Sequence, residues 1–109
     1  MTAVSAFARV CALSDLPDGG VIAVQVAGEP VAVVRAGGEV FALRDSCSHA
    51  EVPLSDGDVY DGVIECPAHG SCFDLRTGAP TCWPATEPVT TYPVRVDGDD
   101  VLVSLRRSG

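Results

Sequence analysis

The sequence predicts an all-β protein with an antiparallel base and a loop-rich insertion in its middle. Three observations lead to this prediction. Short runs rich in valine and isoleucine recur near both ends of the chain, and β-branched side chains favour pleated, half-buried strands. Glycine-rich turns separate neighbouring runs. No stretch carries a helical periodicity of useful length.

Four strands are expected in the first half of the chain. They are the runs FARVCAL (7–13), VIAVQV (21–26), PVAVVR (30–35) and VFALR (40–44). The last two flank the turn AGGE (36–39), and glycine supplies the positive φ that tight hairpin turns need. The sequence therefore predicts a β-hairpin over residues 30–44.

A second hairpin is expected near the end of the chain, where the runs YPVRV (92–96) and VLVSL (101–105) flank the turn DGDD. Apolar side chains alternate in both arms, as in strands with one buried face. The intervening segment 45–90 differs, because it holds both histidines and most of the prolines. Only short extended stretches are expected there, at 62–65 and 72–78.

Length and charge narrow the possible functions. The chain has 109 residues, which suits one domain. Its net charge of −8 argues against nucleic acid as a partner, and fits either solubility or steering towards basic protein surfaces. No apolar run approaches the ~18–20 residues that span a bilayer. No secretory signal is recognisable, so a cytoplasmic location without membrane attachment is expected.

The number of cysteines is odd, at five, so complete pairing within the chain is impossible. Disulfides are also rare in a reducing cytosol. Cys11 and Cys82 are expected to be small buried hydrophobic residues, and Cys72 an ordinary strand residue.

Both histidines of the chain follow a cysteine closely. The pattern is Cys47-x-His49, then sixteen residues, then Cys66-x-x-His69. Two thiolates and two imidazoles form a four-ligand set. Structural zinc is one candidate, but zinc motifs usually group cysteine with cysteine and histidine with histidine. A 2Fe-2S centre in which two histidines replace two cysteines on one iron fits the pattern better.

The segments CSH and CPAHGSCFD resemble the two cluster-binding loops of Rieske proteins. The tail TGAPTCWPATEPVTTYPVRVDGDDVLVSL is similar to that of the small Rieske ferredoxins of bacterial ring-hydroxylating dioxygenase systems. The resemblance implies one Rieske domain over 1–109. It has an antiparallel β-sandwich base at about 1–45 and 85–109, and a cluster-binding subdomain at about 46–84.

The same resemblance implies one Rieske 2Fe-2S cluster as cofactor. Cys47 and Cys66 would bind one iron, and His49 and His69 the other. The implied role is that of a monomeric one-electron carrier, not an enzyme. Its partners would be a flavin-dependent ferredoxin reductase, which uses NAD(P)H, and a terminal oxygenase that hydroxylates aromatic rings.

Residues near the ligands refine this expectation. By resemblance, Ser71 donates a hydrogen bond to a cluster sulfur, and Trp83 and Pro84 shield the cluster. A core position is the alternative for Trp83. Respiratory Rieske proteins carry a disulfide between the loops where this chain has Val52 and Ala68.

Phe73 stands where those respiratory proteins have a tyrosine that donates a hydrogen bond to the cluster. The expected reduction potential is therefore low to intermediate. Pro67, Gly70 and Gly78 are expected in tight turns around the cluster.

Two other functions remain open. The first is the small subunit of an assimilatory nitrite reductase, which has the same fold. The second is a redox-sensing or iron-sensing regulatory module. An enzyme with its own substrate site is not expected. The histidines are assigned to iron, and the G-x-G-x-x-G pattern of dinucleotide-binding proteins is missing from the sequence.

Overall fold

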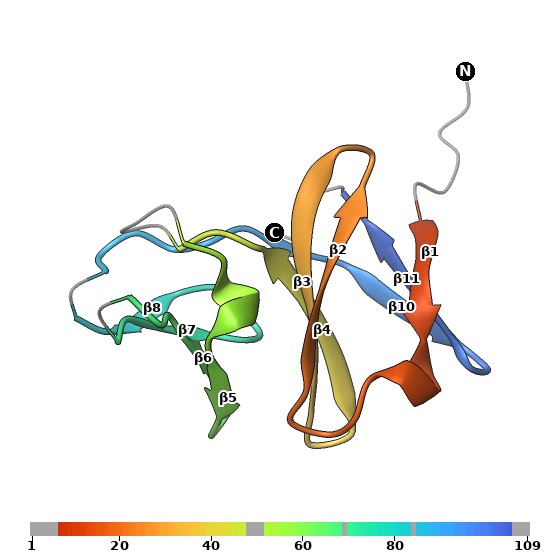
Figure 1. Ribbon diagram of the computed structural model, residues 1–109, viewed down its shortest axis with the longest axis horizontal. Coiled ribbons are helices and arrows are strands. Elements are labelled where there is room, and N and C mark those ends of the chain that lie inside the picture. The colour runs from red at the N-terminus through yellow and green to blue at the C-terminus, as the bar shows by residue number, and fades with distance from the viewer. Residues whose placement is uncertain (1–6, 48–51, 69, 84, 106–109) are drawn as a thin grey trace.

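The computed structural model describes residues 7–47, 52–68, 70–83 and 85–105. Within these residues there is no α-helix, only two short 3-10 helices, η1 (Leu13–Asp15) and η2 (Leu54–Asp56). The strands form three antiparallel sheets (Figure 1). The all-β prediction is therefore confirmed.

The described strands form one three-stranded sheet and two four-stranded sheets. The first sheet contains β1 (Phe7–Ala12), β11 (Asp100–Ser104) and β10 (Val94–Asp97), in that order. The second contains β2 (Val21–Val26), β3 (Glu29–Ala36), β4 (Glu39–Arg44) and β9 (Thr91–Tyr92). The third contains β5 (Asp58–Tyr60), β6 (Val63–Glu65), β7 (Cys72–Asp74) and β8 (Pro80–Cys82).

The second sheet is the middle layer, with the first sheet on one side and the third on the other (Figure 1). Strand β3 is buried on both faces. Val31 and Val33 pack with Val101 and Val103 of β11, whereas Val34 packs towards the third sheet. Each fully buried valine contributes roughly 1.5–3 kcal/mol relative to an exposed one. The first two sheets thus form the expected sandwich.

Two separate groups of buried side chains result. We call the group between the first two sheets the base core; it comprises Cys11, Leu16, Val26, Val31, Val33, Ala42, Tyr92, Val101 and Val103. We call the group between the second and third sheets the loop core; it comprises Val34, Leu43, Cys47, Leu54, Ile64, Cys66, Phe73, Leu75, Ala85 and Val89.

Both predicted hairpins are confirmed. Ala36 pairs with Glu39 across Gly37 and Gly38, whose φ angles of +60° and +82° are those of a tight two-residue hairpin turn. In the second hairpin β10 and β11 pair around the turn that contains Gly98, with φ at +62°.

Several predicted strand ends differ from the structure. The strand expected over 7–13 ends at Ala12, because η1 begins at the next residue. The strand expected over 92–96 is divided at Pro93, which has no N–H to donate to a neighbouring strand. The stretch expected over 72–78 stays extended only to Asp74.

Beyond Asp74 the chain turns. The Asp74 carboxylate accepts hydrogen bonds from the backbone N–H groups of Arg76 and Thr77, at 2.8 and 3.1 Å. These bonds stabilise a turn in place of an extended strand, because aspartate readily accepts hydrogen bonds from the backbone that follows it.

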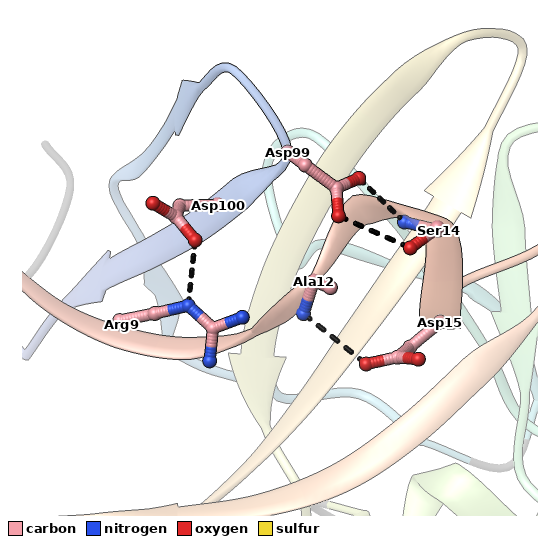
Figure 2. A network of polar contacts seen from close by, with 6 residues as sticks. All are labelled: Arg9, Ala12, Ser14, Asp15, Asp99 and Asp100. Atoms are coloured by element: carbon pink, nitrogen blue, oxygen red, sulfur yellow. Dashed lines mark hydrogen bonds and ion pairs between the residues drawn. The ribbon is translucent and has the colours of Figure 1, made fainter.

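Polar contacts join the two ends of the described chain (Figure 2). Arg9 forms an ion pair with Asp100 at 2.6 Å, and Asp99 accepts from the N–H and the hydroxyl of Ser14 at 3.0 and 3.1 Å. These contacts are exposed, so each adds little stability, but they hold η1 against the turn that joins β10 and β11.

None of the helices in the described part of the chain has the length and apolar character needed to cross a membrane.

Candidate metal centre

The two cysteines of the predicted ligand set belong to the same buried group of side chains. Cys47 lies just after β4 and Cys66 lies just after β6. Their exposed fractions are 5% and 1%, and both belong to the loop core. His49 and His69 lie outside the described residues, so the structure reports on the cysteine half of the site.

The loop that carries Cys47 is closed by backbone and side-chain bonds. The N–H of Cys47 donates to the carbonyl of Val52 at 3.0 Å. The Asp45 carboxylate accepts from the N–H and the hydroxyl of Ser55 at 2.7 and 2.6 Å. These bonds fix where the chain leaves β4 and returns to η2, so Cys47 sits at a defined position.

The loop that carries Cys66 is closed at its base in the same way. The N–H of Cys66 donates to the carbonyl of Ser71 at 2.6 Å, and the N–H of Gly70 donates to the carbonyl of Cys66 at 3.1 Å. Gly70 has a φ of +77°, a conformation that glycine adopts without strain. The turn predicted at Gly70 is therefore present.

The segment 85–89, which follows β8, packs on the Cys66 loop. Ser71 is fully buried, and its hydroxyl accepts a hydrogen bond from the N–H of Ala85 at 3.1 Å. A serine hydroxyl also has one proton to donate. The observed contact is thus compatible with the predicted hydrogen bond from Ser71 to a cluster sulfur, which stays a prediction.

Gly78 anchors the same segment at a second point. The N–H of Val89 donates to the carbonyl of Gly78 at 2.9 Å. Gly78 has a φ of +78°, and a Cβ added there would lie 2.1 Å from the Val89 carbonyl oxygen. Only glycine allows this close approach, which confirms the predicted turn.

Trp83 and Cys82 precede this segment, and both are exposed. The side chain of Trp83 is 79% exposed, which excludes the alternative of a core aromatic. Its predicted shielding of the cluster stays a prediction, and Pro84 lies outside the described residues. Cys82 is exposed, so its prediction as a buried hydrophobic residue was wrong. Strand β8 lies at an edge of the third sheet, where its side chains are less covered.

The other two cysteines outside the ligand set follow their predictions. Cys11 is buried in the base core, and Cys72 is buried in β7.

Sequence reasoning missed a polar group next to the Cys66 loop. Tyr60 donates to the Glu65 carboxylate at 2.6 Å, and its oxygen lies 3.7 Å from the Cys72 sulfur. The hydrogen bond to Glu65 is the main cause that raises the pKa of Tyr60, and the contact with Cys72 adds to it. The Asp61–Gly62 pair, a common hairpin turn, was the signal that could have placed Tyr60 beside β6.

The described residues fit a 2Fe-2S cluster. Two thiols from separate loops share one buried group of side chains, and buried thiolates are the iron ligands of such clusters. Apolar neighbours such as Leu54 and Phe73 limit the access of water, which influences the potential of a metal site. Phe73 belongs to the loop core, and Val52 packs against it.

Comparison with known proteins supports this interpretation. The model of a family described as the Rieske [2Fe-2S] domain matches residues 6–93. The anthranilate 1,2-dioxygenase ferredoxin subunit of Burkholderia cepacia is 51% identical over 84 residues, which cover 76% of this chain and 78% of that protein.

Similar solved structures support the same interpretation. The ferredoxin of carbazole 1,9a-dioxygenase from Nocardioides aromaticivorans IC177 is 45% identical, with a TM-score of 0.88 and coverage of 92% of this chain and 98% of that one. A chain from a complex of reduced oxygenase and oxidized ferredoxin in carbazole 1,9a-dioxygenase is 36% identical. Its TM-score is 0.89, with coverage of 95% of this chain and 97% of that one.

Proposed function

The chain belongs to the Rieske [2Fe-2S] domain family, and from that premise we propose that it is a one-electron carrier. It passes electrons from an NAD(P)H-dependent flavin reductase to a terminal oxygenase that hydroxylates aromatic rings. The single observation that carries this proposal is the pair of buried thiols, Cys47 and Cys66, on adjacent closed loops of a family member.

Membership of the Rieske family supports the ligand assignment. Cys47 and Cys66 would hold one iron, and His49 and His69 would hold the other. The bound cluster would supply the capacity to accept and release one electron. Imidazole ligands in place of thiolates raise the potentials of such centres to roughly −150 to +300 mV, against about −400 mV for all-cysteine plant-type clusters.

The protein's own residues have a positioning role. The closing bonds at Cys47 and Cys66 hold the two loops still when the charge of the site changes. A rigid site suits a carrier, because little of its surroundings must reorganise with each electron. Ser71 and Phe73 are both fully buried. The hydroxyl of Ser71 raises the reduction potential, whereas Phe73 lacks the tyrosine hydroxyl that would raise it further. The potential is therefore low to intermediate.

Partner recognition uses surface charge in this proposal. The net charge of −8 steers encounters with basic surfaces on the reductase and the oxygenase. Solubility is the simpler explanation of the same charge, and the salt dependence of the electron-transfer rate separates the two explanations.

The carrier acts as a monomer in the cytoplasm, away from membranes. Its division into a base and a cluster-binding subdomain over 46–84 stays a prediction.

Reconstitution tests the function directly. The cluster-loaded chain is mixed with a flavin reductase and an aromatic-ring-hydroxylating oxygenase of the same host, and product formation is followed with NAD(P)H as the electron source. We expect turnover to rise in proportion to the chain and to stop when a Cys66→Ser variant replaces it. A cluster-loaded chain that supports no turnover would contradict the proposal.

Co-purification distinguishes the carrier from the two alternative functions. A nitrite reductase small subunit or a redox-sensing module would co-purify with one stable partner, whereas a carrier separates from both of its partners. The ferredoxin names of the proteins compared above favour the carrier.

A further inference from the structure

Two cysteines outside the predicted ligand set face each other in the third sheet. Cys72 of β7 and Cys82 of β8 are paired positions in the antiparallel ladder. Cys72 is 2% exposed, whereas Cys82 lies at the surface of the edge strand. The pair therefore combines one accessible thiol with one buried thiol directly beside it.

The backbone brings these two residues within the range of a disulfide. Opposed residues of an antiparallel pair have Cα atoms about 4.5 or 5.5 Å apart. Disulfides span Cα distances of roughly 4.4–6.8 Å. Side chains of opposed residues also project to the same face of the sheet, so the two sulfurs can approach each other.

The pKa of the Cys72 thiol is raised, first by its burial and second by the neighbouring Cys82. The register shifts between Cys72 and Phe73, because Phe73 pairs with Pro80 and leaves Thr81 as an extra residue. Such a bulge twists the edge strand locally and is a common way to re-aim a side chain.

We propose that Cys72 and Cys82 form a reversible intramolecular disulfide, a redox modification site distinct from the cluster, with a low-molecular-weight disulfide such as oxidised glutathione as the oxidant. The thiolate of Cys82, the accessible residue, attacks one sulfur of the oxidant and releases one thiol. Cys72 then attacks the Cys82 sulfur of the mixed disulfide and releases the second thiol. Two cysteine thiols are oxidised, and one oxidant disulfide is reduced to two thiols.

A Cys72–Cys82 disulfide would change the hydrogen bonds of the Cys66 loop. The Cys72 thiol donates to the carbonyl of Gly70 at 3.5 Å and lies 3.7 Å from the Tyr60 oxygen. Disulfide formation removes the proton of Cys72, so Gly70 loses this donor. This inference does not depend on the electron-carrier function, because the pair and the oxidant are separate from the predicted ligands.

Mass spectrometry tests the proposal on the cluster-loaded chain. The protein is equilibrated with glutathione buffers of increasing oxidised fraction, then denatured, alkylated and digested with trypsin. Cleavage after Arg76 puts Cys72 and Cys82 on different peptides. We expect a linked pair of these peptides that appears with the oxidised fraction and disappears with excess reduced glutathione. Unlinked peptides at every ratio would overturn the proposal.

Variants identify the residues. The linked peptides should vanish in Cys82→Ser and Cys72→Ser and persist in Cys11→Ala, which removes a cysteine of the base core. Fragmentation of the wild-type linked peptides decides the matter even if Cys72→Ser fails to fold. A bond from Cys82 to Cys47 or Cys66 would overturn the proposal.

Discussion

The hydroxyl of Ser71 accepts a hydrogen bond from the backbone N–H of Ala85 at 3.1 Å, in a buried part of the structure. Ser71 follows the loop that carries Cys66, whereas Ala85 belongs to the segment after Trp83. One side chain thus fastens two loops of the candidate site to each other. The bond makes Ser71 a structural element of the site, besides its predicted role towards the cluster.

The first prediction concerns Ser71→Ala. The substitution leaves the buried N–H of Ala85 without this acceptor, which costs about 1–3 kcal/mol of unfolding free energy. Urea unfolding of the cluster-loaded protein measures the loss. Ser14→Ala is the matched control, because its hydroxyl bond to Asp99 is exposed and its loss should cost under about 0.5 kcal/mol. Equal losses in both variants would contradict the assigned role of Ser71.

The same variant tests the predicted hydrogen bond from Ser71 to the cluster. A hydrogen bond to a charged group contributes roughly 1.5–3 kcal/mol. At about 59 mV per 1.4 kcal/mol for one electron, its loss lowers the midpoint potential by at most ~60–130 mV. Protein-film voltammetry provides the measurement. An unchanged potential in Ser71→Ala would show that the hydroxyl serves Ala85 alone.

The second prediction compares two glycines with positive φ. Gly78→Ala forces a Cβ into the Val89 carbonyl oxygen, whereas Gly98→Ala meets no atom within 4 Å. Both variants carry the left-handed strain of about 1–2 kcal/mol, so the difference between them isolates the steric clash. We expect a clearly lower melting temperature and faster cluster loss for Gly78→Ala than for Gly98→Ala. Equal melting temperatures would show that the Gly78–Val89 contact adds no stability.

The third prediction concerns alkaline pH. The pKa of Tyr60 lies above its usual value, chiefly because its hydroxyl is hydrogen-bonded to Glu65 and secondarily to Cys72. A raised tyrosine pKa stabilises the folded state below the unfolded value of about 10, and this contribution is lost as the pH rises through the folded value. The absorbance titration of wild type minus that of Tyr60→Phe reports this residue alone.

In that difference titration, Tyr60 should ionise above pH 10 in the wild type and at lower pH in Glu65→Gln, which keeps the shape of the side chain and removes its charge. Ionisation at the ordinary value in both proteins would mean that the Tyr60–Glu65 bond does not form in solution.

The fourth prediction concerns metal removal. Cys47→Ser and Cys66→Ser should abolish the iron, the acid-labile sulfide and the visible colour, because each removes a ligand of the same iron. Cys11→Ala is the control, since Cys11 is buried in the base core, between the first and second sheets. Full cluster content in either ligand variant would refute the assignment.

The local features of the fold could be predicted from the sequence. The hairpin around Gly37 and Gly38 follows from turn chemistry within a few residues, and the structure has it with the expected positive φ. The cysteines of the candidate site were found for a similar reason, because each histidine follows its cysteine by two or three residues. Both features follow from patterns that span only a few residues of the sequence.

Features that depend on distant segments could not be predicted. The pairing of β1 with β11 joins residues about ninety positions apart, and nothing in either run specifies its partner. The Ser71–Ala85 bond likewise needs the two loops to be placed first. Cys82 was misjudged because the average preference of cysteine for the interior says nothing about a three-residue edge strand.

EPR spectroscopy of the dithionite-reduced protein decides whether this chain holds one Rieske-type 2Fe-2S cluster. We predict one S = 1/2 signal from a coupled ferric–ferrous pair, with an average g below the free-electron value. The cysteine variants Cys47→Ser and Cys66→Ser should lack the signal. A colourless, EPR-silent protein that contains stoichiometric zinc would contradict the account.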